Sequence, residues 1–577
     1  MSADFKTTLI KDGRLADITD QLAYAVASGA SSNTYQQFSA VSTSNSSMTF
    51  NIQVPSENIV VSREVLIQTD IYFTINITGV PLGQTAFNYG STDAFQAFPL
   101  NSLFTTCSAQ INNTNVSSNL QDILPSILRL NDNRELYRYN GMTPCLPDQA
   151  YKRFIDGVDT ANNPLGDYGD QSYDGDLIPR GAFPVSGLTL LHNITAGGTD
   201  ADPISTNVLD TFVITGMVKV TEPLMGLSPF IYGDAVYNKQ GLVGINAMSF
   251  VFNIDSSCKR FFSTASPYTY SVSLGTQAQQ NPFQNTRMLV NFLSTQPTDL
   301  ISARNVVPYM DLPRYLSLQS STGALNAGAS ASYNSQNIQI NQLPDYFIIS
   351  VRKPMSTQSV KDSSTFFKIN SISVNLNNTS GLLSSALPED LWRISVNNHS
   401  TQSWTEFSGS ATSADNATGV GTAVRTTGSL LILSPAYDLS LPDYLSSGSI
   451  GQYNFQFQIN CTNIDSVAVV PEICIICVNS GIFTTIAGSS NIYTGILTKQ
   501  MVLDAKTNEE SIDPVSSVQY NRMVGGASMC DRIATSAKKL PIVRDLTEKA
   551  RRMVGMGVPS GAGVPSGAGS RLEKLCY

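Results

Sequence analysis

The feature that most constrains the fold of this chain is an alternation of apolar and polar residues with period two. Phe50-Asn-Ile-Gln-Val54 shows it in its simplest form, because successive side chains of a strand point to opposite faces and only one face is buried. Residues 65–77 form a longer run rich in β-branched and aromatic residues, which favour strands. Long loops rich in Gly, Asp, Asn and Pro separate such runs. The pattern predicts an all-β protein with long loops and few short helices.

The predicted strands are numerous enough for two antiparallel sandwiches in succession. We predict an N-terminal arm over 1–48, a first sandwich over 49–262, a second over 263–503 and a tail over 504–577. A short apolar pattern from Leu9 to Val26 indicates one helix in the arm. The further predicted strands cover 105–111, 208–220, 248–254, 268–274, 288–293, 346–351, 366–376, 429–433, 453–459, 468–478 and 481–486.

Two other segments have the pattern of helices. Residues 118–130 place apolar side chains mostly three or four apart, with Pro125 either in the first turn or at a kink. In the tail, 528–554 has the pattern of a broken helix interrupted by Pro541. Two copies of Val-Pro-Ser-Gly-Ala-Gly follow at 558–569. This composition cannot build a packed core, so we expect the end of the tail to be flexible.

The chain offers almost no catalytic or metal-binding inventory. It contains two histidines, His192 and His399, which nearly removes histidine acid–base catalysis and histidine-ligated metals. Cys474-Ile-Ile-Cys477 has metal-site spacing, but residues three apart on a strand point to opposite faces. Residues 156–176 contain six aspartates that could bind calcium, although a solvated acidic loop is the simpler interpretation. We therefore expect two buried strand cysteines, no enzyme activity, no catalytic residue, no metal and no cofactor.

Composition favours a structural or binding protein. Charged residues make up only 14% of the chain, against about 25% in ordinary globular proteins, so much of the surface is expected to be uncharged or buried against partners. No signal peptide is visible after Met1, and no apolar run is long enough for a membrane span. The eight cysteines are scattered, unlike a secreted disulfide framework. These features indicate synthesis in the cytosol.

The net charge of −9 hides a difference between the tail and the rest of the chain. From Arg522 onward, ten Lys and Arg and four Asp and Glu residues give +6, whereas the remaining residues carry −15. A basic tail on an acidic body predicts an anionic partner, either nucleic acid or a lipid surface. A tail whose charge only keeps it soluble is the alternative. The candidate anionic contacts lie largely off the apolar stripe of the broken helix: Arg544, Lys549, Arg551 and Arg552.

A set of short segments spread over most of 60–500 carries a family signal. They are Ala97-Phe-Pro-Leu-Asn-Ser-Leu-Phe104, Ile111-Asn-Asn-Thr114, Pro282-Phe-Gln-Asn-Thr-Arg287, 371–384, Leu391-Trp392, Gln402-Ser-Trp-Thr-Glu-Phe-Ser-Gly409, 439–448 and Tyr453-Asn-Phe-Gln-Phe457. In this combination and order, the chain resembles the major capsid proteins of double-stranded DNA viruses of the Polinton-like virus, adintovirus and virophage group. None of the segments is a catalytic signature.

The resemblance implies two consecutive antiparallel eight-stranded jelly rolls that stand upright. It further implies that three chains form a homotrimer, a pseudo-hexagonal capsomer of an icosahedral viral shell. The expected partners are neighbouring capsomers, minor or penton capsid proteins and, through the basic tail, packaged DNA or an inner membrane. The protein would be found in the virion after synthesis in the cytoplasm or nucleus of the host cell.

The resemblance also suggests maturation of the tail by a viral protease. Viruses of this group often carry an adenovirus-type cysteine protease that prefers apolar-x-Gly-x before a Gly or another small residue. Met553-Val-Gly-Met-Gly557 matches this preference, and the two Ser-Gly-Ala-Gly copies match it more loosely. A linker to a terminal anchor at 572–577 is the alternative. The candidate cleavage region comprises Gly555, Gly557, Gly561, Gly563, Gly567 and Gly569.

Two other functions compete with this interpretation. A β-sandwich with loops rich in Asn, Asp and Tyr could be a carbohydrate-binding or attachment protein, and Tyr168 and Tyr173 in the acidic loop offer a weak aromatic platform. A single-jelly-roll penton or minor capsid protein of the same kind of virus is the other alternative. The length of the chain and its second group of predicted strands argue against a single jelly roll.

Overall fold

The computed structural model describes most residues from 31 to 498, together with 6–10 and 24–28. Its main internal gaps are 148–182, 194–208, 231–240, 296–303 and 414–421. The chain divides into a unit of Met1–Ala505 and a unit of Lys506–Tyr577, and the second unit lies outside the described residues. In the part that is described, no helix is both long and apolar enough to cross a membrane.

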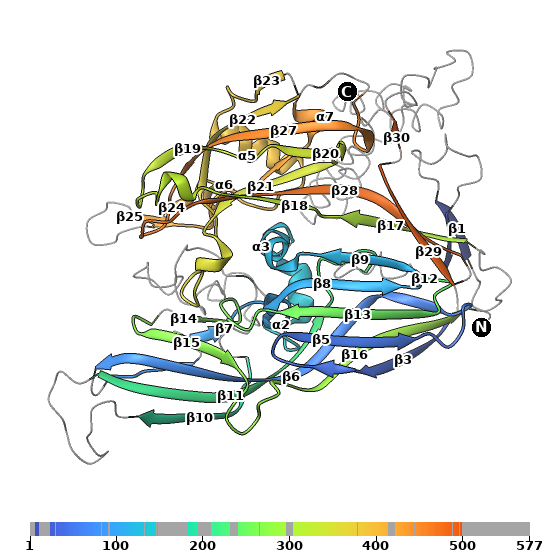
Figure 1. Cartoon of the computed structure of the whole chain (residues 1–577), viewed down its shortest axis with the longest axis horizontal. Helices are drawn as coiled ribbons and strands as arrows, with labels where there is room; N and C mark the ends of the chain where they lie inside the picture. The colour runs from blue at the N-terminus through green and yellow to red at the C-terminus, as the bar shows by residue number, and fades with distance from the viewer. Residues whose placement is uncertain are drawn as a thin grey trace, which may run out of the picture. The chain divides into compact units, whose positions relative to one another are not determined.

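The first part of the chain forms two facing antiparallel sheets (Figure 1). One sheet has the order β10 (Ser186–Asn193), β11 (Leu209–Pro223), β6 (Val60–Pro81), β16 (Phe283–Thr295) and β3 (Ser31–Ser39), with β12 (Gly241–Leu242) and β15 (Thr269–Leu274) also on β6. The other has the order β4 (Ser42–Thr43), β5 (Ser47–Gln53), β13 (Ala247–Ile254), β8 (Phe104–Ile111) and β9 (Thr114–Ser118). A short pair, β7 (Asp93–Phe95) and β14 (Phe262–Thr264), lies nearby.

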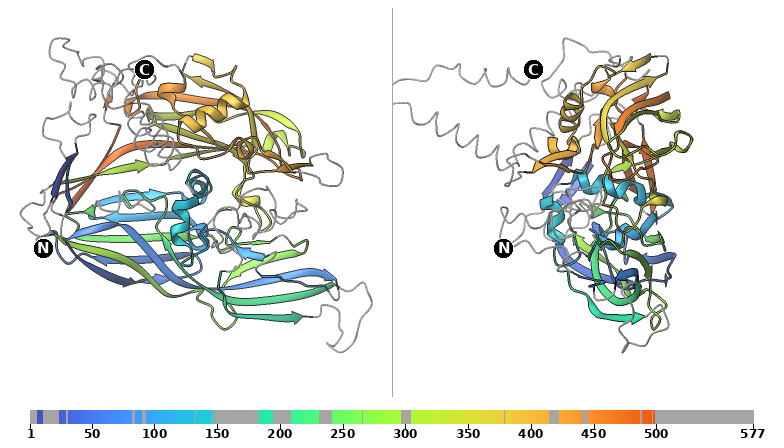
Figure 2. Two further views of the ribbon diagram at one scale, coloured as in Figure 1. Left: turned by 180° about the vertical axis from the view of Figure 1, so that it is seen from behind. Right: turned by 90° about the vertical axis from the view of Figure 1, so that its left-hand side faces the viewer.

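The second part repeats this arrangement (Figures 1 and 2). One sheet has the order β17 (Arg304–Asp311), β28 (Glu472–Ile486), β21 (Tyr346–Arg352) and β26 (Leu431–Leu433), with β18 (Arg314–Leu318) and β29 (Ser489–Thr494) on β28. The other has β19 (Ser330–Asn334), β27 (Ser449–Thr462), β22 (Lys368–Leu376) and β23 (Thr379–Leu382), with β20 (Ile338–Gln342) and β30 (Leu497–Thr498) on β27. A separate pair of antiparallel strands consists of β24 (Ser410–Ser413) and β25 (Thr422–Arg425).

Few helices interrupt the strands in the described part, as the sequence predicts. The helix expected over 118–130 is present as α3 (Leu120–Leu130), with Pro125 in its interior and not in its first turn. The other α-helices are short: α2 (Pro99–Leu103), α4 (Asn133–Leu136), α5 (Pro388–Asn397), α6 (Trp404–Phe407) and α7 (Pro435–Asp438).

The alternation read from the sequence is the alternation of burial in the sandwiches. Along β6, every second side chain is buried through most of the strand. In the first core, the Phe73 and Phe95 rings meet edge to face at 5.3 Å. In the second core, Phe347 meets Phe455 at 4.8 Å and Phe457 at 5.2 Å. Aromatic pairs in this geometry add to the apolar burial that holds two sheets together.

Strand pairing differs in two places from the division expected from the sequence. Strands β15 and β16 lie beyond residue 262, yet both pair with β6 in the first sandwich. In the expected arm, β3 pairs with β16, and β1 (Lys6–Ile10) pairs with β2 (Tyr24–Ser28). These two strands occupy the ends of the stretch in which a helix was expected, while residues 11–23 lie outside the described part.

The two sandwiches share one turn in detail. Asn112 follows β8 and Asn377 follows β22, and both have the left-handed backbone conformation that Asn tolerates. The Asn112 Oδ1 accepts from the Asn246 amide and the Asn377 Oδ1 from the Asn454 amide, each at 2.9 Å. Each turn contains two residues, because the last strand pair before it is Ile111 with Thr114 in the first sandwich and Leu376 with Thr379 in the second. The second sandwich is thus a structural counterpart of the first.

Candidate functional site

The junction between the two sandwiches has an apolar part, which depends on the alternation of side-chain direction along β28. Cys477 points into the core of the second sandwich, whereas Cys474 and Ile476 point out of it and pack against Ile123 of α3. Figure 1 shows α3 between the two sandwiches. The prediction that Cys474 and Cys477 are buried on opposite faces is confirmed, and burial raises the pKa of both thiols.

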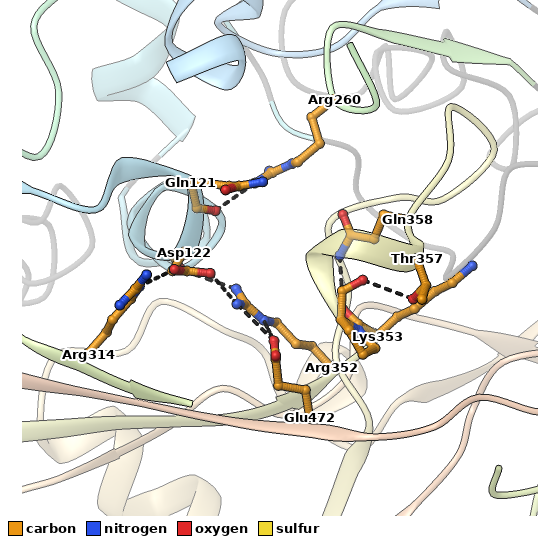
Figure 3. A network of polar contacts seen from close by, with 10 residues as sticks. Gln121, Asp122, Arg260, Arg314, Arg352, Lys353, Thr357, Gln358 and Glu472 are labelled. Carbon is orange, nitrogen blue, oxygen red and sulfur yellow. Dashed lines mark hydrogen bonds and ion pairs between the residues drawn. The ribbon is translucent and has the colours of Figure 1, made fainter. Parts of the chain in front are cut away.

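A buried ionic network joins α3 to the same sheet (Figure 3). The Asp122 carboxylate of α3 forms ion pairs with Arg314 of β18 and Arg352 of β21. Arg352 also pairs with Glu472 at 3.1 Å, its partner in the register of β21 and β28. Only 2% of the Arg352 side chain is exposed. Because these groups come from both sandwiches, neither one contains the complete network.

The network contains two arginines and two carboxylates, and a third arginine, Arg260, lies close to it. Burial acts to lower the pKa of Arg352, but Cys474, Asp122 and Glu472 outweigh it, and the result lies above the ordinary value. Burial, together with the repulsion of Arg352, lowers the pKa of Arg260 to about 10. An arginine with that pKa remains charged near neutral pH, and a buried charge is costly unless it is hydrogen-bonded or paired. The polar partners of Arg260 therefore offset the cost of its burial.

Backbone carbonyls and a serine hydroxyl accept hydrogen bonds from two further arginines of this junction. Arg260 donates to the Gln121 carbonyl at 3.3 Å and to the Ser364 Oγ at 2.8 Å. Arg129 donates to the Ser364 carbonyl at 3.0 Å, and its own carbonyl accepts from the Thr401 hydroxyl at 3.0 Å. The junction therefore fixes α3 against strands and loops of the second sandwich through directional contacts as well as apolar packing.

A second connection comes from strands that extend from one sandwich to the other. The first half of β28 pairs with β21, and its second half pairs with β17 and β29. Phe483 in this second half is buried in the core of the first sandwich. The Ser490 hydroxyl of β29 donates to the Ile111 carbonyl at 2.6 Å, and the Ser490 amide donates to the Asn113 Oδ1 at 2.7 Å. The two sandwiches are thus joined at both α3 and β28.

Sequence reasoning missed a buried carboxylate in the first sandwich. Glu222 accepts from the amides of Leu100 and Asn101 at 2.9 and 2.8 Å, from the Asn101 Nδ2 at 2.8 Å and from Thr143 at 3.0 Å. These hydrogen bonds give the segment 97–104 a structural role, because the Glu222 carboxylate accepts from the first amides of α2 and fixes the start of this helix. Burial raises the pKa of Glu222 to about 7, against the lowering effect of these hydrogen bonds.

The segment 402–409 has an equivalent structural role in the second sandwich. Gln402 is buried, and its side chain donates to the Gly428 carbonyl at 3.1 Å and accepts from the Leu430 amide at 3.1 Å. Its carbonyl accepts from the Trp392 indole at 3.0 Å. Ser403 and Glu406 then form the capping box that starts α6. These residues hold a loop in place and form no reactive group.

A shallow groove of about 350 Å³ crosses the outer face of β5, β8 and β13. It is lined by Asn51, Ile52, Gln53, Gln110, Asn112, Ala247, Met248 and Ser249. Its lining contains hydroxyl, amide and aliphatic side chains and no aromatic ring, so it lacks the platform expected of a carbohydrate site. Among the described residues, no group of three or more His, Cys, Asp or Glu could hold a metal ion.

Most of the site residues predicted from sequence lie outside the described residues. This applies to the acidic loop 156–176 with Tyr168 and Tyr173, and to every residue from 499 onward, which includes the whole tail. The candidate cleavage residues Gly555, Gly557, Gly561, Gly563, Gly567 and Gly569 and the candidate anionic contacts Arg544, Lys549, Arg551 and Arg552 therefore stay predictions.

Comparisons with known proteins agree with this architecture. A family model of the first domain of the Sputnik virophage major capsid protein matches residues 3–293, and one of the C-terminal domain of major capsid protein V20 matches residues 312–481. A Sputnik virophage protein described as capsid protein V20 is 27% identical over 530 residues, which cover 90% of this chain and 84% of the relative.

Solved structures show the same fold. A chain of the 3.5 Å cryo-EM structure of Sputnik virophage matches with a TM-score of 0.69 and 24% identity, covering 89% of this chain and 98% of the other. The crystal structure of the mavirus major capsid protein matches with a TM-score of 0.61 and 15% identity, covering 82% and 93%. The fold is the double jelly roll predicted from the sequence. With the first family model spanning half of its length, the chain belongs to the virophage major capsid proteins, which are structural components of the virion and not enzymes.

Proposed function

We propose that three copies of this chain form a homotrimer, and that the trimer is a pseudo-hexagonal capsomer of an icosahedral shell. The observation that carries the proposal is the double connection between two similar sandwiches, through α3 and through β28. A chain in which two similar units are fixed to each other contributes two of six positions, so three chains supply a ring of six. Cyclic assembly of this kind uses heterologous contacts that close on themselves.

Uncharged sheet surfaces support lateral contacts between copies. In the first sandwich, strands β5, β8, β9 and β13 contain no Asp, Glu, Lys or Arg. In the second, β19, β20 and β27 contain none either. The exposed side chains of β27 include Gln452, Asn454, Gln456 and Gln458. Burying such faces against a neighbour costs less desolvation than burying charges, and the amide groups can form hydrogen bonds across the contact.

Light scattering of the purified protein at physiological salt tests the trimer. We expect the mass of three chains, and electron microscopy is expected to show pseudo-hexagonal particles and, under assembly conditions, closed shells. A monomer at micromolar concentration would overturn the proposal. Within a shell, the remaining partners would be neighbouring capsomers and minor or penton capsid proteins.

For the basic tail we propose a position inside the particle. Its charge of +6 from Arg522 onward would meet packaged DNA or an inner membrane, with contacts from Arg544, Lys549, Arg551 and Arg552. Limited proteolysis of intact virions is expected to leave the tail uncut. Removal of 522–577 should leave trimers intact, because both jelly-roll cores lie before it. A tail that is cut on intact particles would contradict an interior position.

Cleavage of the tail during maturation is a further proposal. The sequence Met553-Val-Gly-Met-Gly557 and the Val-Pro-Ser-Gly-Ala-Gly copies supply small residues suited to a protease cleft. Intact-mass spectrometry of protein from mature virions is expected to show chains that end between Gly555 and Gly569. A full-length mass would instead favour a linker that carries a terminal anchor at 572–577.

A further inference from the structure

Strand β10 exposes three leucines at an open sheet edge. It is the outermost strand of its sheet, next to β11 (Figures 1 and 2), and within the described part of the chain it pairs with β11 alone. Leu188, Leu190 and Leu191 are 42%, 56% and 58% exposed. No other four consecutive residues of the described part expose as many large apolar side chains.

The leucines lie on both faces of this edge. Leu190 is opposite Ile214 in the register of β10 and β11, and Ile214 belongs to the buried core. Leu190 therefore lies on the same face of the sheet as the core, but at the edge strand this face is exposed to solvent. Leu191 is opposite Val213 and lies on the outer side. An edge with leucines on both faces buries little of its apolar surface within one chain.

From Thr189 onward, the edge also lacks the features that usually prevent strand addition. The sequence of β10, Ser-Gly-Leu-Thr-Leu-Leu-His-Asn, contains no Lys, Arg, Asp, Glu or Pro. Its register irregularity lies at its start, between Ser186 and Thr189. Natural sheets protect exposed edges with charges, prolines or bulges, because an open apolar edge is a template for another strand. A strand that remains unprotected here points to a partner that covers it.

We propose that β10 pairs in antiparallel orientation with β10 of a second copy of this chain, across a two-fold axis between neighbouring capsomers. The proposal rests on the proposed function in one respect, since a shell brings capsomers edge to edge. Pairing of a strand with its own copy is isologous and two-fold, whereas contacts within a cyclic trimer are heterologous. The two copies bring no like charges together, and leucines of one copy cover those of the other on both faces.

The size of the edge argues for a contact made only in the shell. Eight residues from each copy are far fewer than the roughly 20–30 residues a side of a stable interface. Such a contact is weak between free trimers. It becomes effective where many copies are engaged simultaneously at fixed spacing. Free trimers should therefore show no association through β10.

Disulfide trapping tests the pairing directly. Single cysteines replace Leu188, Thr189, Leu190 or Leu191 in a full-length chain that also carries Cys530→Ser and Cys576→Ser, since the described cysteines are buried. We expect oxidation of assembled particles to give a covalent dimer that peaks at one of the four positions, and oxidation of free trimers to give none. Absence of a dimer at all four positions in particles would overturn the proposal. Protection of these cysteines from a thiol reagent in free trimers would also overturn it, because it would mean that the trimer already covers the edge.

A charge at the edge provides a second readout. Leu190→Lys is expected to abolish shell formation while light scattering still shows trimers with an unchanged thermal midpoint. The matched control is Leu387→Lys, which changes an equally exposed leucine on the second sandwich and should assemble. Loss of the trimer in Leu190→Lys would place β10 inside the capsomer and overturn the inference. Absence of trimers in the unmodified protein would instead contradict the proposed function, so the two failures are distinguishable.

Discussion

Arg260 replaces the backbone donor that Pro125 removes from α3. In a regular helix the amide of residue 125 would donate to the Gln121 carbonyl, but proline has no amide hydrogen. The Arg260 Nη1 donates to that carbonyl instead, at 3.3 Å. A residue that weakens the helix on its own is thus accommodated by a buried arginine from the loop after β13. This relationship explains how a proline fits in the interior of the helix that separates the two jelly rolls.

A double-mutant cycle checks this relationship. Arg260→Met should cost about 1 kcal/mol less in a Pro125→Ala background than in the native chain, because the alanine amide can then donate to Gln121. The lost bond to Ser364 cancels in the cycle. Urea unfolding of the four proteins at fixed concentration measures the difference. Arg287→Met, whose side chain pairs with Gln68 and Gln37, serves as the control and should show no coupling to position 125.

Asp122 is expected to be the most sensitive residue of the ionic network. Asp122→Asn removes the carboxylate shared by Arg314 and Arg352 and leaves buried positive charge in excess. Removal of one partner from a buried pair typically costs about 3–5 kcal/mol, and we expect a loss of about 3 because Arg352 keeps Glu472. The matched control is Asp70→Asn, whose carboxylate accepts from Asn285 at the surface. Equal urea midpoints for the two variants would contradict a structural role for the network.

The sequence predicted what depends on local pattern. Period-two alternation located most strands, and the three-residue spacing of Cys474 and Cys477 was sufficient to place them on opposite faces. Both are properties of a single strand, so no knowledge of its neighbours was required. The hairpins after β8 and β22 carried a further signal, Asn-Asn-Thr at 112–114 and at 377–379, which marks the equivalent turns of the two jelly rolls.

Long-range pairing is what local pattern could not supply. Strand β16 pairs with β6 more than 200 residues earlier in the chain, so the predicted division at 262 separated strands of one sheet. The junction was missed for the same reason: Asp122, Arg352 and Glu472 are far apart in the sequence. A usable signal was present, because charges are rare in the predicted strands: Glu472 interrupts the apolar run 468–478, and Arg352 directly follows the predicted strand 346–351.

Gly428 and Gly448 form a natural comparison between backbone strain and steric exclusion. Both have φ of +85°, but a Cβ on Gly428 would lie 2.0 Å from the Phe366 carbonyl oxygen, whereas nothing lies within 4 Å of one on Gly448. Gly448→Ala should cost about 1–2 kcal/mol, the usual penalty of the left-handed conformation. Gly428→Ala must in addition displace backbone, and we expect loss of soluble folded protein. Similar thermal midpoints for the two variants would show that the loop at Gly428 adjusts.

Glu222 predicts a pH dependence that its glutamine variant lacks. The folded pKa of about 7 lies above the ordinary value of 4.5, so between these values the folded chain binds more protons than the unfolded chain. The stability contributed by this group is therefore fully present below about pH 4.5 and is lost as the pH rises through about 7, with a total of about 3 kcal/mol.

The measurement is the difference in unfolding free energy between the native chain and Glu222→Gln. We expect this difference to shift against the native chain by about 1 kcal/mol between about pH 6 and about pH 8, because the carboxyl loses its proton in a fully buried site. Other titrating groups are common to both proteins and cancel. Glu389→Gln, at an exposed position on α5, is the matched control and should follow the native chain across the same range. A difference that stays constant with pH would mean that the four donors around Glu222 offset its burial and keep the carboxylate ionised throughout.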